Sequence, residues 1–314
     1  MASIAYITDQ NMISYHRLNG NTEINFWRPS AGKKISDFKK GDMLFFLAKG
    51  TEKGRGREKG LIGYGKLKQT KTLSLKGMWN RYQERNGYPS FNQLSEAICK
   101  VSKDKKIPAR LNCMELESVV FFQEPIYLSE FGIVISNKIE SFFYLDREDP
   151  MITSKILQKA DEFGVDMWTA MLQDDPAADF RNDAVFSAVV NAYEMIKENY
   201  YTVYENKRNA KYAVTLMQHY PHSQFLPDSR SDFIIRSANE LIVAIPLIVN
   251  SNAFQASFQY AIGHYLIYRS YLKSALETCE DVHLMMFFNQ EISIDAKHIL
   301  NDLHIQYQIM REIK

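Results

Sequence analysis

The stretch FQYAIGHYLIYRSYL, residues 258–272, gives the clearest indication of how this chain folds. Its apolar residues recur every three or four positions, which places them along one face of an α-helix. Gly263 lies inside this pattern, and a glycine in a helix costs roughly 1 kcal/mol relative to alanine. We therefore expect a helix packed against a core, with a close approach at Gly263. The apolar face contains Phe254, Phe258, Ala261, Tyr265, Tyr268 and Leu272.

The segments around this helix alternate between helical and extended patterns. NDAVFSAVVNAYEMIKENY (182–200) predicts a helix, and SDFII (231–235) and ELIVAIPLIV (240–249) predict a strand pair. After the quoted helix come the strand VHLMMFF (282–288), a helix at 296–303 and the strand HIQYQIM (304–310). This order favours a mixed α/β layer architecture.

The first half of the chain has a different texture. Short strand-like runs, separated by Gly, Pro, Lys and Asn, predict a small barrel or curled sheet. One helix interrupts them: SFNQLSEAICKV begins with Ser90 as its N-cap and places Leu94, Ile98 and Val101 on one face. The strand-like runs are ASIAYIT (2–8), INFW (24–27), MLFFLA (43–48), LIGYGKL (61–67) and ESVVFF (117–122).

Length and composition predict a cytoplasmic protein of two domains. The chain has 314 residues, 46% of them hydrophobic and 24% charged, which is usual for a soluble protein. Its strongest apolar run has nine residues (241–249), whereas a membrane-spanning helix needs roughly 20. Cys99, Cys113 and Cys279 show no paired spacing, which argues against a zinc ribbon or disulfides. We expect an N-terminal domain at 1–147, an acidic helical connector at 148–181 and a C-terminal domain at 182–314.

Charge is distributed unevenly along the chain. Residues 33–76 hold thirteen Lys/Arg and four Asp/Glu, whereas 140–183 hold four and eleven. A basic block of this kind is typical of a surface that binds a polyanion, although a solvated loop explains it equally well. The segment KGTEKGRGREKG lacks the GK[ST] of a nucleotide P-loop. Its candidate phosphate contacts are Lys49, Lys53, Arg55, Arg57 and Lys59.

Four motifs in the first half occur in the order of a known domain. They are NFWRPS (25–30), GDMLFFLAKG (41–50), GLIGYGKL (60–67) and SLKGMWNRYQERNGYPSFNQLSEAI (74–98). Together they resemble the EVE/PUA-like domain of predicted modification-dependent restriction endonucleases. Tyr82 and Gln83 depart from the Phe-Gly that this family often has there. The resemblance implies a PUA-like β-barrel that reads a modified base.

A base can be read on its face and edge only after it leaves the stack, so such a site needs aromatic walls and a few polar groups. The alternative is that the tryptophans are core aromatics of a small barrel. The candidate base-binding residues are Phe26, Trp27, Arg28, Tyr64, Trp79 and Asn86.

The second half resembles PD-(D/E)XK nucleases, notably the excision-controlling-factor family. AIGHYLIYRSYL is similar to that family's AxGQYxxYRxxL helix, with His264 in place of glutamine. The resemblance implies an α/β restriction-endonuclease-like domain in which an aspartate and a glutamate hold Mg²⁺ or Mn²⁺ and a lysine stabilises charge. Asp232 fits the aspartate, but Ala244 and Pro246 occupy the Glu and Lys positions. A metal site at Asp232 would therefore have to use Glu240, Asp228 or His264. Three explanations stay open: the domain is a degenerate nuclease, it carries inactivating substitutions, or this alignment of the strand with the motif is wrong.

These patterns predict a protein of restriction-type antiphage defence that binds base-modified duplex DNA. The expected partners are DNA and a second copy of the chain, because cutting two strands favours a dimer. Three alternatives stay open: a metal-dependent endonuclease, a non-catalytic protein that recruits a partner, and an RNA reader.

Overall fold

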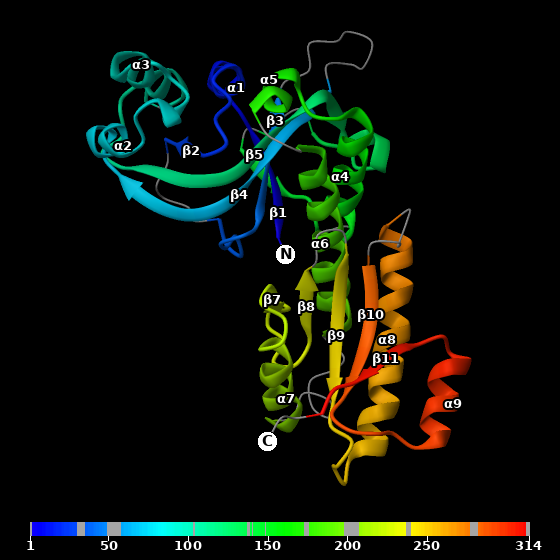
Figure 1. Ribbon diagram of the computed structural model, residues 1–314. Helices are drawn as coiled ribbons and strands as arrows, with labels where there is room; N and C mark the ends of the chain where they lie inside the picture. Colours follow the sequence, from blue (N-terminus) through cyan, green and yellow to red (C-terminus); the bar gives the residue numbers. More distant parts are fainter. Residues whose placement is uncertain are drawn as a thin grey trace. The chain divides into compact units, whose positions relative to one another are not determined.

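The computed structural model describes residues 2–29, 35–48, 58–102, 104–136, 139, 141–147, 149–172, 176–197, 207–236, 240–276 and 282–311 (Figure 1). The chain divides into two compact units, Met1–Asp183 and Ala184–Lys314. The first unit thus includes the whole of the expected connector, which forms helices α4 (Ile152–Phe163) and α5 (Met167–Leu172) and the start of α6 (Pro176–Lys197). Both units mix helices with a sheet, so the fold is α+β.

The first unit is built on a six-stranded sheet with the order β2-β5-β4-β3-β1-β6. β1 and β3 are parallel, and the other neighbours are antiparallel. β4 and β5 form a long curved ribbon (Figure 1), whose register shifts at bulges that bend the strands. The strands are β1 (Ser3–Ile7), β2 (Ile24–Arg28), β3 (Met43–Ala48), β4 (Gly60–Leu73), β5 (Leu111–Tyr127) and β6 (Phe142–Tyr144).

Short helices begin at side-chain caps around this sheet. Asp9 caps α1 (Gln10–Leu18), Ser74 caps α2 (Leu75–Tyr82) and Ser90 caps α3 (Phe91–Val101), each by accepting backbone N–H groups. The predicted Ser90 cap is therefore confirmed. Leu94 and Ile98 are buried as expected, but Val101 is 47% exposed because the helix ends there. The 3₁₀ turns are η2 (Gln83–Asn86) and η3 (Leu128–Phe131).

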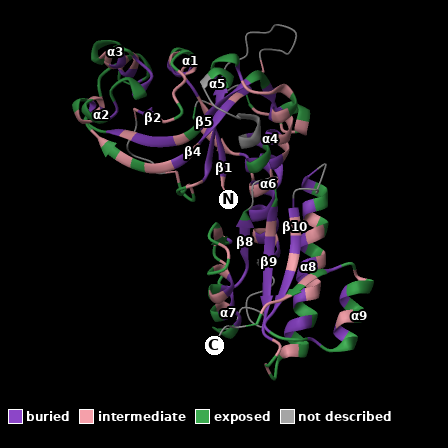
Figure 2. Cartoon of the chain, in the orientation of Figure 1, coloured by how far each residue is buried: buried purple, intermediate pink, exposed green. Residues whose placement is uncertain are grey.

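The second unit is built on a five-stranded sheet with the order β11-β10-β9-β8-β7. β7, β8 and β9 form an antiparallel meander, and β10 and β11 run parallel to β9. Figure 2 shows the central strands β9 and β10 largely buried. The strands are β7 (Ser223–Phe225), β8 (Phe233–Arg236), β9 (Leu241–Leu247), β10 (Val282–Phe288) and β11 (Gln306–Ile309).

Two helices cover opposite faces of this second sheet. α7 (Lys207–Met217) packs through Tyr212 and Leu216 into a cluster with Phe233, Ala244 and Phe287. α8 (Phe254–Ala275) lies against the other face, where its Phe258 ring is 6.2 Å from that of Phe288. Side chains alternate along β9. Val243 and Ile245 therefore point to the α8 face.

Helix α8 carries two polar residues, His264 and Arg269, within its aromatic sequence. The predicted stripe is buried from Phe258 to Leu272, and His264 is buried with it. Arg269 donates to the carbonyl oxygens of Leu303 and His304 (3.2 and 3.3 Å), which follow helix α9 (Ile294–Asp302). Arg269 therefore secures the end of a neighbouring helix. Among the helices that the structure describes, none has both the length and the apolar character needed to cross a bilayer.

Gly87 follows η2 with a φ angle of +84°, a backbone conformation that residues other than glycine rarely adopt. A Cβ atom there would lie 2.2 Å from Cγ of the buried Met12 and 3.0 Å from Nε2 of His16. The turn thus requires glycine for both its conformation and its packing.

We expect Gly87→Ala to lower the free energy of unfolding of the first unit by about 2–5 kcal/mol, from backbone strain plus overpacking. Gly132→Ala is the matched control, since Gly132 has φ +76° but no atom within 4 Å of an added Cβ. The control should cost only about 1–2 kcal/mol. All three tryptophans lie in the first unit, so tryptophan fluorescence in urea reports on it. Equal losses for the two variants would contradict the packing explanation.

Candidate functional site

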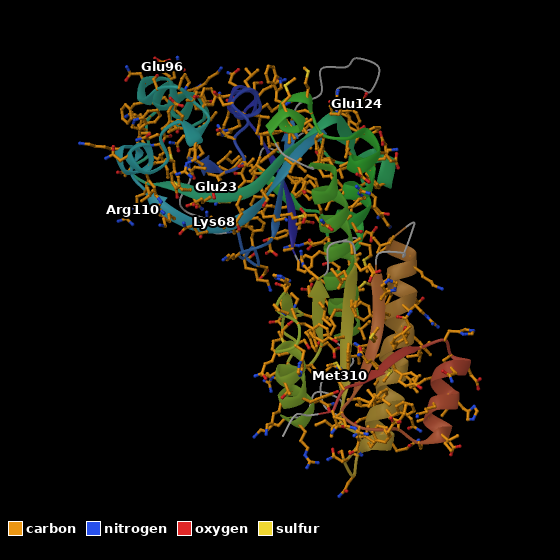
Figure 3. The ribbon with its side chains drawn as sticks, viewed as in Figure 1. Glu23, Lys68, Glu96, Arg110, Glu124 and Met310 are labelled. Atoms are coloured by element: carbon orange, nitrogen blue, oxygen red, sulfur yellow. The ribbon has the colours of Figure 1, made fainter. Side chains whose placement is uncertain are left out.

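A cavity of about 490 Å³ lies in the first unit between α1, the turn after η2, and α3. Asp9, Asn11 and Tyr15 line it from the α1 side, and residues 87–89 form part of its wall. From α3 it receives the polar side chains of Gln93, Glu96 and Lys100. Figure 3 shows Glu96 on this helix. The cavity thus combines two tyrosines with hydrogen-bonding groups.

Tyr88 is the most deeply buried polar side chain of this cavity. It is 8% exposed, and its hydroxyl makes no hydrogen bond of ordinary geometry in the part of the chain that the structure describes. Burial raises the pKa of Tyr88 above its ordinary value, and the neighbouring Asp9 carboxylate raises this pKa further. Asp9 is thus the polar neighbour of this buried hydroxyl at the cavity.

Buried hydrogen bonds from β2 hold the turn that carries Tyr88. Trp27 Nε1 donates to the Asn86 carbonyl oxygen (3.0 Å), and Asn25 Nδ2 donates to Asn86 Oδ1 (2.8 Å). Asn86 Nδ2 in turn donates to the Gln83 carbonyl oxygen (2.7 Å). The Trp27 ring lies 6.4 Å from the Tyr88 ring. Trp27 and Asn86, both predicted to touch a base, are therefore brought together behind the cavity wall.

The other predicted base-binding residues lie elsewhere in the first unit. Phe26, Arg28 and Tyr64 are buried, and the Tyr64 hydroxyl donates to Asp183 (2.7 Å). Trp79 is half-buried, with its ring 6.1 Å from that of Phe91. None of the six predicted residues lines the cavity. Their direct contact with a base stays a prediction.

Of the five predicted phosphate contacts, Lys49, Lys53, Arg55 and Arg57 lie outside the described residues. Lys59 is 7% exposed and donates to the Ile139 carbonyl oxygen (2.9 Å). A lysine in this position supports the backbone of its own unit.

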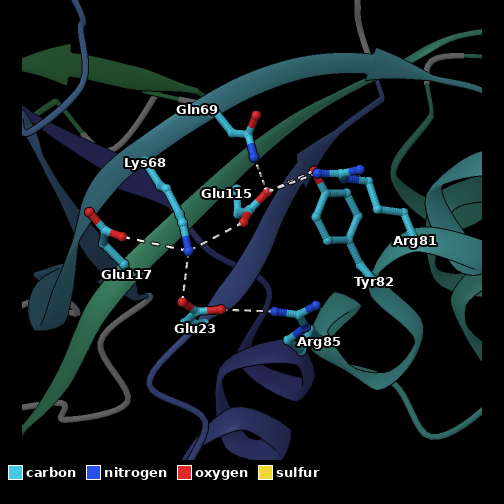
Figure 4. Close-up of polar contacts among 8 residues, drawn as sticks. All are labelled: Glu23, Lys68, Gln69, Arg81, Tyr82, Arg85, Glu115 and Glu117. Atoms are coloured by element: carbon cyan, nitrogen blue, oxygen red, sulfur yellow. Dashed lines mark hydrogen bonds and ion pairs between the residues drawn. The ribbon is translucent and has the colours of Figure 1, made fainter.

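Two further lysines of the basic block are paired with carboxylates. Lys66 Nζ lies 2.6 Å from Asp183. Lys68 Nζ lies 2.8 Å from Glu23 and within 3.8 Å of Glu115 and Glu117 (Figure 4). The hydrogen bond with Glu23 raises the pKa of Lys68, and the same bond lowers the pKa of Glu23. The positive charge of the block is thus partly neutralised within the fold.

The same network attaches α2 and η2 to the sheet. Arg85 of η2 contacts Glu23 (2.9 Å), and Arg81 of α2 lies 3.8 Å from Glu115 (Figure 4). Glu115 also accepts from Gln69 (2.7 Å) and from the Tyr82 hydroxyl (3.3 Å). Because the arginines are exposed, these pairs orient the turn more than they stabilise the fold.

In the second unit, Asp232 and His264 meet inside the protein. His264 Nε2 of α8 lies 3.1 Å from Asp232 Oδ2, and the two side chains are 2% and 1% exposed. The His264 ring packs edge-on against the rings of Tyr193 and Tyr268, at 6.0 and 5.8 Å. The Tyr268 hydroxyl donates to the Val189 carbonyl oxygen (2.6 Å). Burial, and then the charge of Asp232, raises the pKa of Tyr268.

The strand register corrects the alignment of the missing catalytic residues. Phe233 pairs with Ala244 and both pack on the α7 face, whereas Asp232 contacts α8. Ala244 therefore does not share the face of Asp232, and by alternation neither does Pro246. Val243 and Ile245 occupy that face of β9, and both are fully buried.

The side chains around Asp232 do not fit a divalent cation. Glu240 is exposed and precedes β9 at the end that pairs with Arg236, so it lies at the opposite end of β8 from Asp232. Mg²⁺ and Mn²⁺ prefer several oxygen ligands, but Val243 and Ile245 supply none. Among the described residues, no three His, Cys, Asp or Glu side chains form a group that could hold a metal.

Sequence reasoning missed Asp9, Tyr15, Tyr88 and Glu96. Asp9 was detectable as a helix cap, and Tyr88 follows the quoted Asn86-Gly87 pair directly. The sequence could not show that these four residues line one cavity, because that depends on how α1 and α3 pack.

Comparisons with known proteins add a distant structural similarity. Neither a protein-family model nor a curated protein sequence matches the chain. The crystal structure of ASCH from Zymomonas mobilis is 14% identical with a TM-score of 0.35, covering 50% of this chain and 94% of that one. A mutant of the same protein is 12% identical with the same TM-score, covering 50% and 95%. A TM-score this low does not establish a shared fold.

His16, next to Gly87, makes the first unit sensitive to acid. Burial lowers its pKa from 6.5 to about 3, so below pH 6.5 the unfolded chain binds a proton that the folded chain does not. The stability that this neutral histidine confers above pH 6.5 should fall by about 3 kcal/mol at pH 4. We expect the urea midpoint of tryptophan fluorescence to fall over this range, and to fall less in His16→Gln.

Comparing the unaltered protein with His16→Gln separates the effect of His16 protonation on stability from the effect of carboxyl protonation. Burial raises the pKa of Asp42 to about 6, which favours the folded state as the pH falls and is common to both proteins. If the urea midpoints of the two proteins fell in parallel as the pH is lowered, the loss of stability in acid would not be due to His16.

Proposed function

We propose that the protein reads a modified base in DNA through the cavity beside Tyr88, in the manner of EVE/PUA-like domains. The observation that carries this proposal is the meeting of two motifs. Asn25 and Trp27 belong to the motif NFWRPS, and Asn86 belongs to the ERNGY part of the fourth motif. Asn25 and Trp27 both donate hydrogen bonds to Asn86. The fourth motif therefore supplies part of the wall of a cavity that contains two tyrosines, and NFWRPS holds the turn of that motif from behind. A flipped base needs aromatic surface and polar edges of this kind.

For the second unit we propose a PD-(D/E)XK-like module that grips DNA or recruits a partner without cutting. The succession of α7, the β7-β8-β9 meander, α8 and β10 supports the nuclease-like part of this proposal. The donor set supports the non-cutting role, since the face of β9 nearest Asp232 carries Val243 and Ile245. Restriction-type defence against modified foreign DNA is the biological role that this pairing suggests.

The test is a binding and cleavage assay on matched duplexes that contain plain, methylated, hydroxymethylated or glucosylated cytosine. We expect at least one modified duplex to bind about tenfold more tightly than the plain one, a difference of about 1.4 kcal/mol. Tyr88→Ala should remove this selectivity, whereas Tyr260→Ala, at an exposed position of the second unit, should not.

The same assay includes Mg²⁺ or Mn²⁺ and an RNA competitor of the same sequence. Duplexes should stay intact, and RNA should compete poorly with the preferred modified duplex. Equal binding of all duplexes would overturn the reader. Metal-dependent cleavage that Asp232→Asn abolishes would overturn the non-cutting role.

A further inference from the structure

A second cavity, of about 260 Å³, lies in the first unit between the segment that precedes β3 and the strands β4 and β5. Ile35 and Phe38 form an apolar wall, and both pack on the core of the unit. The strands contribute polar side chains, Thr70 and Thr72 from β4 and Asn112 from β5. This cavity shares no lining residue with the larger cavity described above.

The strand register places the polar groups side by side on one face of the sheet. Thr72 pairs with Asn112, and Asn112 pairs in turn with Arg28 of β2. Residues that lie opposite each other on antiparallel strands share a face, so these three side chains form a row. Gln69 and Glu115 are each three positions away along their strands, so they point to the other face. The carboxylates that pair with Lys68 through Glu115 (Figure 4) therefore do not face this cavity.

The polar side chains of this second cavity are open to a ligand. Thr70 and Thr72 are exposed, and Asn112 is half-buried. Within the described part of the chain, none of these three side chains takes part in a hydrogen bond. Two hydroxyls and an amide can each donate to an acceptor. None of the described residues that line the cavity is acidic, so its donors suit an anion.

Positive charges flank both sides of this cavity. Lys39 and Lys40 are exposed and directly follow Phe38 of the apolar wall. Arg110 is exposed at the end of the β4-β5 ribbon, immediately before β5 begins (Figure 3). These three cations outnumber Asp37, the exposed carboxylate of the segment before β3. The surroundings of the cavity are thus basic as well as its lining being free of acid.

We propose that this second cavity binds the sugar–phosphate backbone of DNA. Phosphate oxygens accept from Thr70, Thr72 and Asn112, since hydroxyl and amide groups are usual phosphate contacts in proteins that bind DNA. Phe38 and Ile35 pack against deoxyribose, which lacks the 2′-hydroxyl of RNA and so suits an apolar wall. The proposal rests on the proposed function only in taking DNA as the partner.

Contacts of this kind add affinity without adding selectivity for a base. Phosphates carry no direct sequence information, so their loss should weaken plain and modified duplexes by the same factor. Hydroxyl donors and cations differ in their response to salt. Only the removal of a cation lowers the number of counterions that binding releases, and this number sets the salt dependence of affinity.

The first test is the double variant Thr70→Val/Thr72→Val, measured by fluorescence anisotropy of a labelled plain duplex. Valine keeps the branched shape of threonine and removes both hydroxyls. Because neither hydroxyl has a hydrogen bond within the described protein, the urea midpoint should stay unchanged. The affinity of the full-length protein should fall about tenfold, with an unchanged dependence on salt.

Arg110→Gln tests the charge beside the cavity. The slope of log affinity against log salt concentration should become about 1 less steep, measured between about 50 and 200 mM salt. Lys155→Gln is the matched control, since it removes the same charge from α4. Gly164, which ends α4, accepts from the backbone of Gln123, at the other end of β5 from Asn112. The control should keep the affinity and the slope of the unaltered protein.

The outcomes separate this inference from the reader function. If Thr70→Val/Thr72→Val binds plain DNA as the unaltered protein does, or if Lys155→Gln changes the slope as much as Arg110→Gln, this inference fails and the reader function stands. It also fails if the threonine variant weakens binding of an RNA of the same sequence but not of DNA. If the variants weaken binding while the unaltered protein treats plain and modified duplexes alike, the reader fails and this surface stands. If no duplex binds, both fail.

Discussion

The buried hydrogen bonds of Asn86 are the constraint on which the first unit's site depends. Asn86 is fully buried, so each of its polar atoms must find a partner inside the protein. Asn25 and Trp27 supply two partners from β2, and Gln83 supplies a third from within the turn. These bonds set the path of the chain into Gly87, and the left-handed glycine then directs Tyr88 into the cavity.

Charged side chains of the first unit are also paired with partners inside the unit. Residues 33–76 are strongly basic in sequence, yet Lys66 and Lys68 contact carboxylates and Lys59 contacts a carbonyl. Asp183, the last residue of the acidic block 140–183, is one of these partners. The two opposite charge blocks therefore meet in one unit, and counting charges along the chain overlooks this internal pairing.

Features that depend on residues close together in the sequence were predictable. Features that depend on contacts between distant segments were not. The stripe of α8 and the Ser90 cap depend on residues three or four positions apart, so the sequence revealed them directly. β4 was expected only over 61–67, because its continuation KQTKTL is polar; pairing with β5 extends it to Leu73. Trp27 and Asn86 were recognised as a group, but a sequence cannot tell whether an aromatic residue faces a ligand or supports the residue that does. Ala244 was matched to the Glu position from the sequence alone, and only the register with β8 shows that its side chain lies on the other face from Asp232.

The second sheet ends in two short strands, β7 with three residues and β11 with four. A short edge exposes few backbone N–H and C=O groups, so it is a poor template for adding a strand from another molecule. Two copies of this unit would consequently have little to gain by joining their sheets edge to edge.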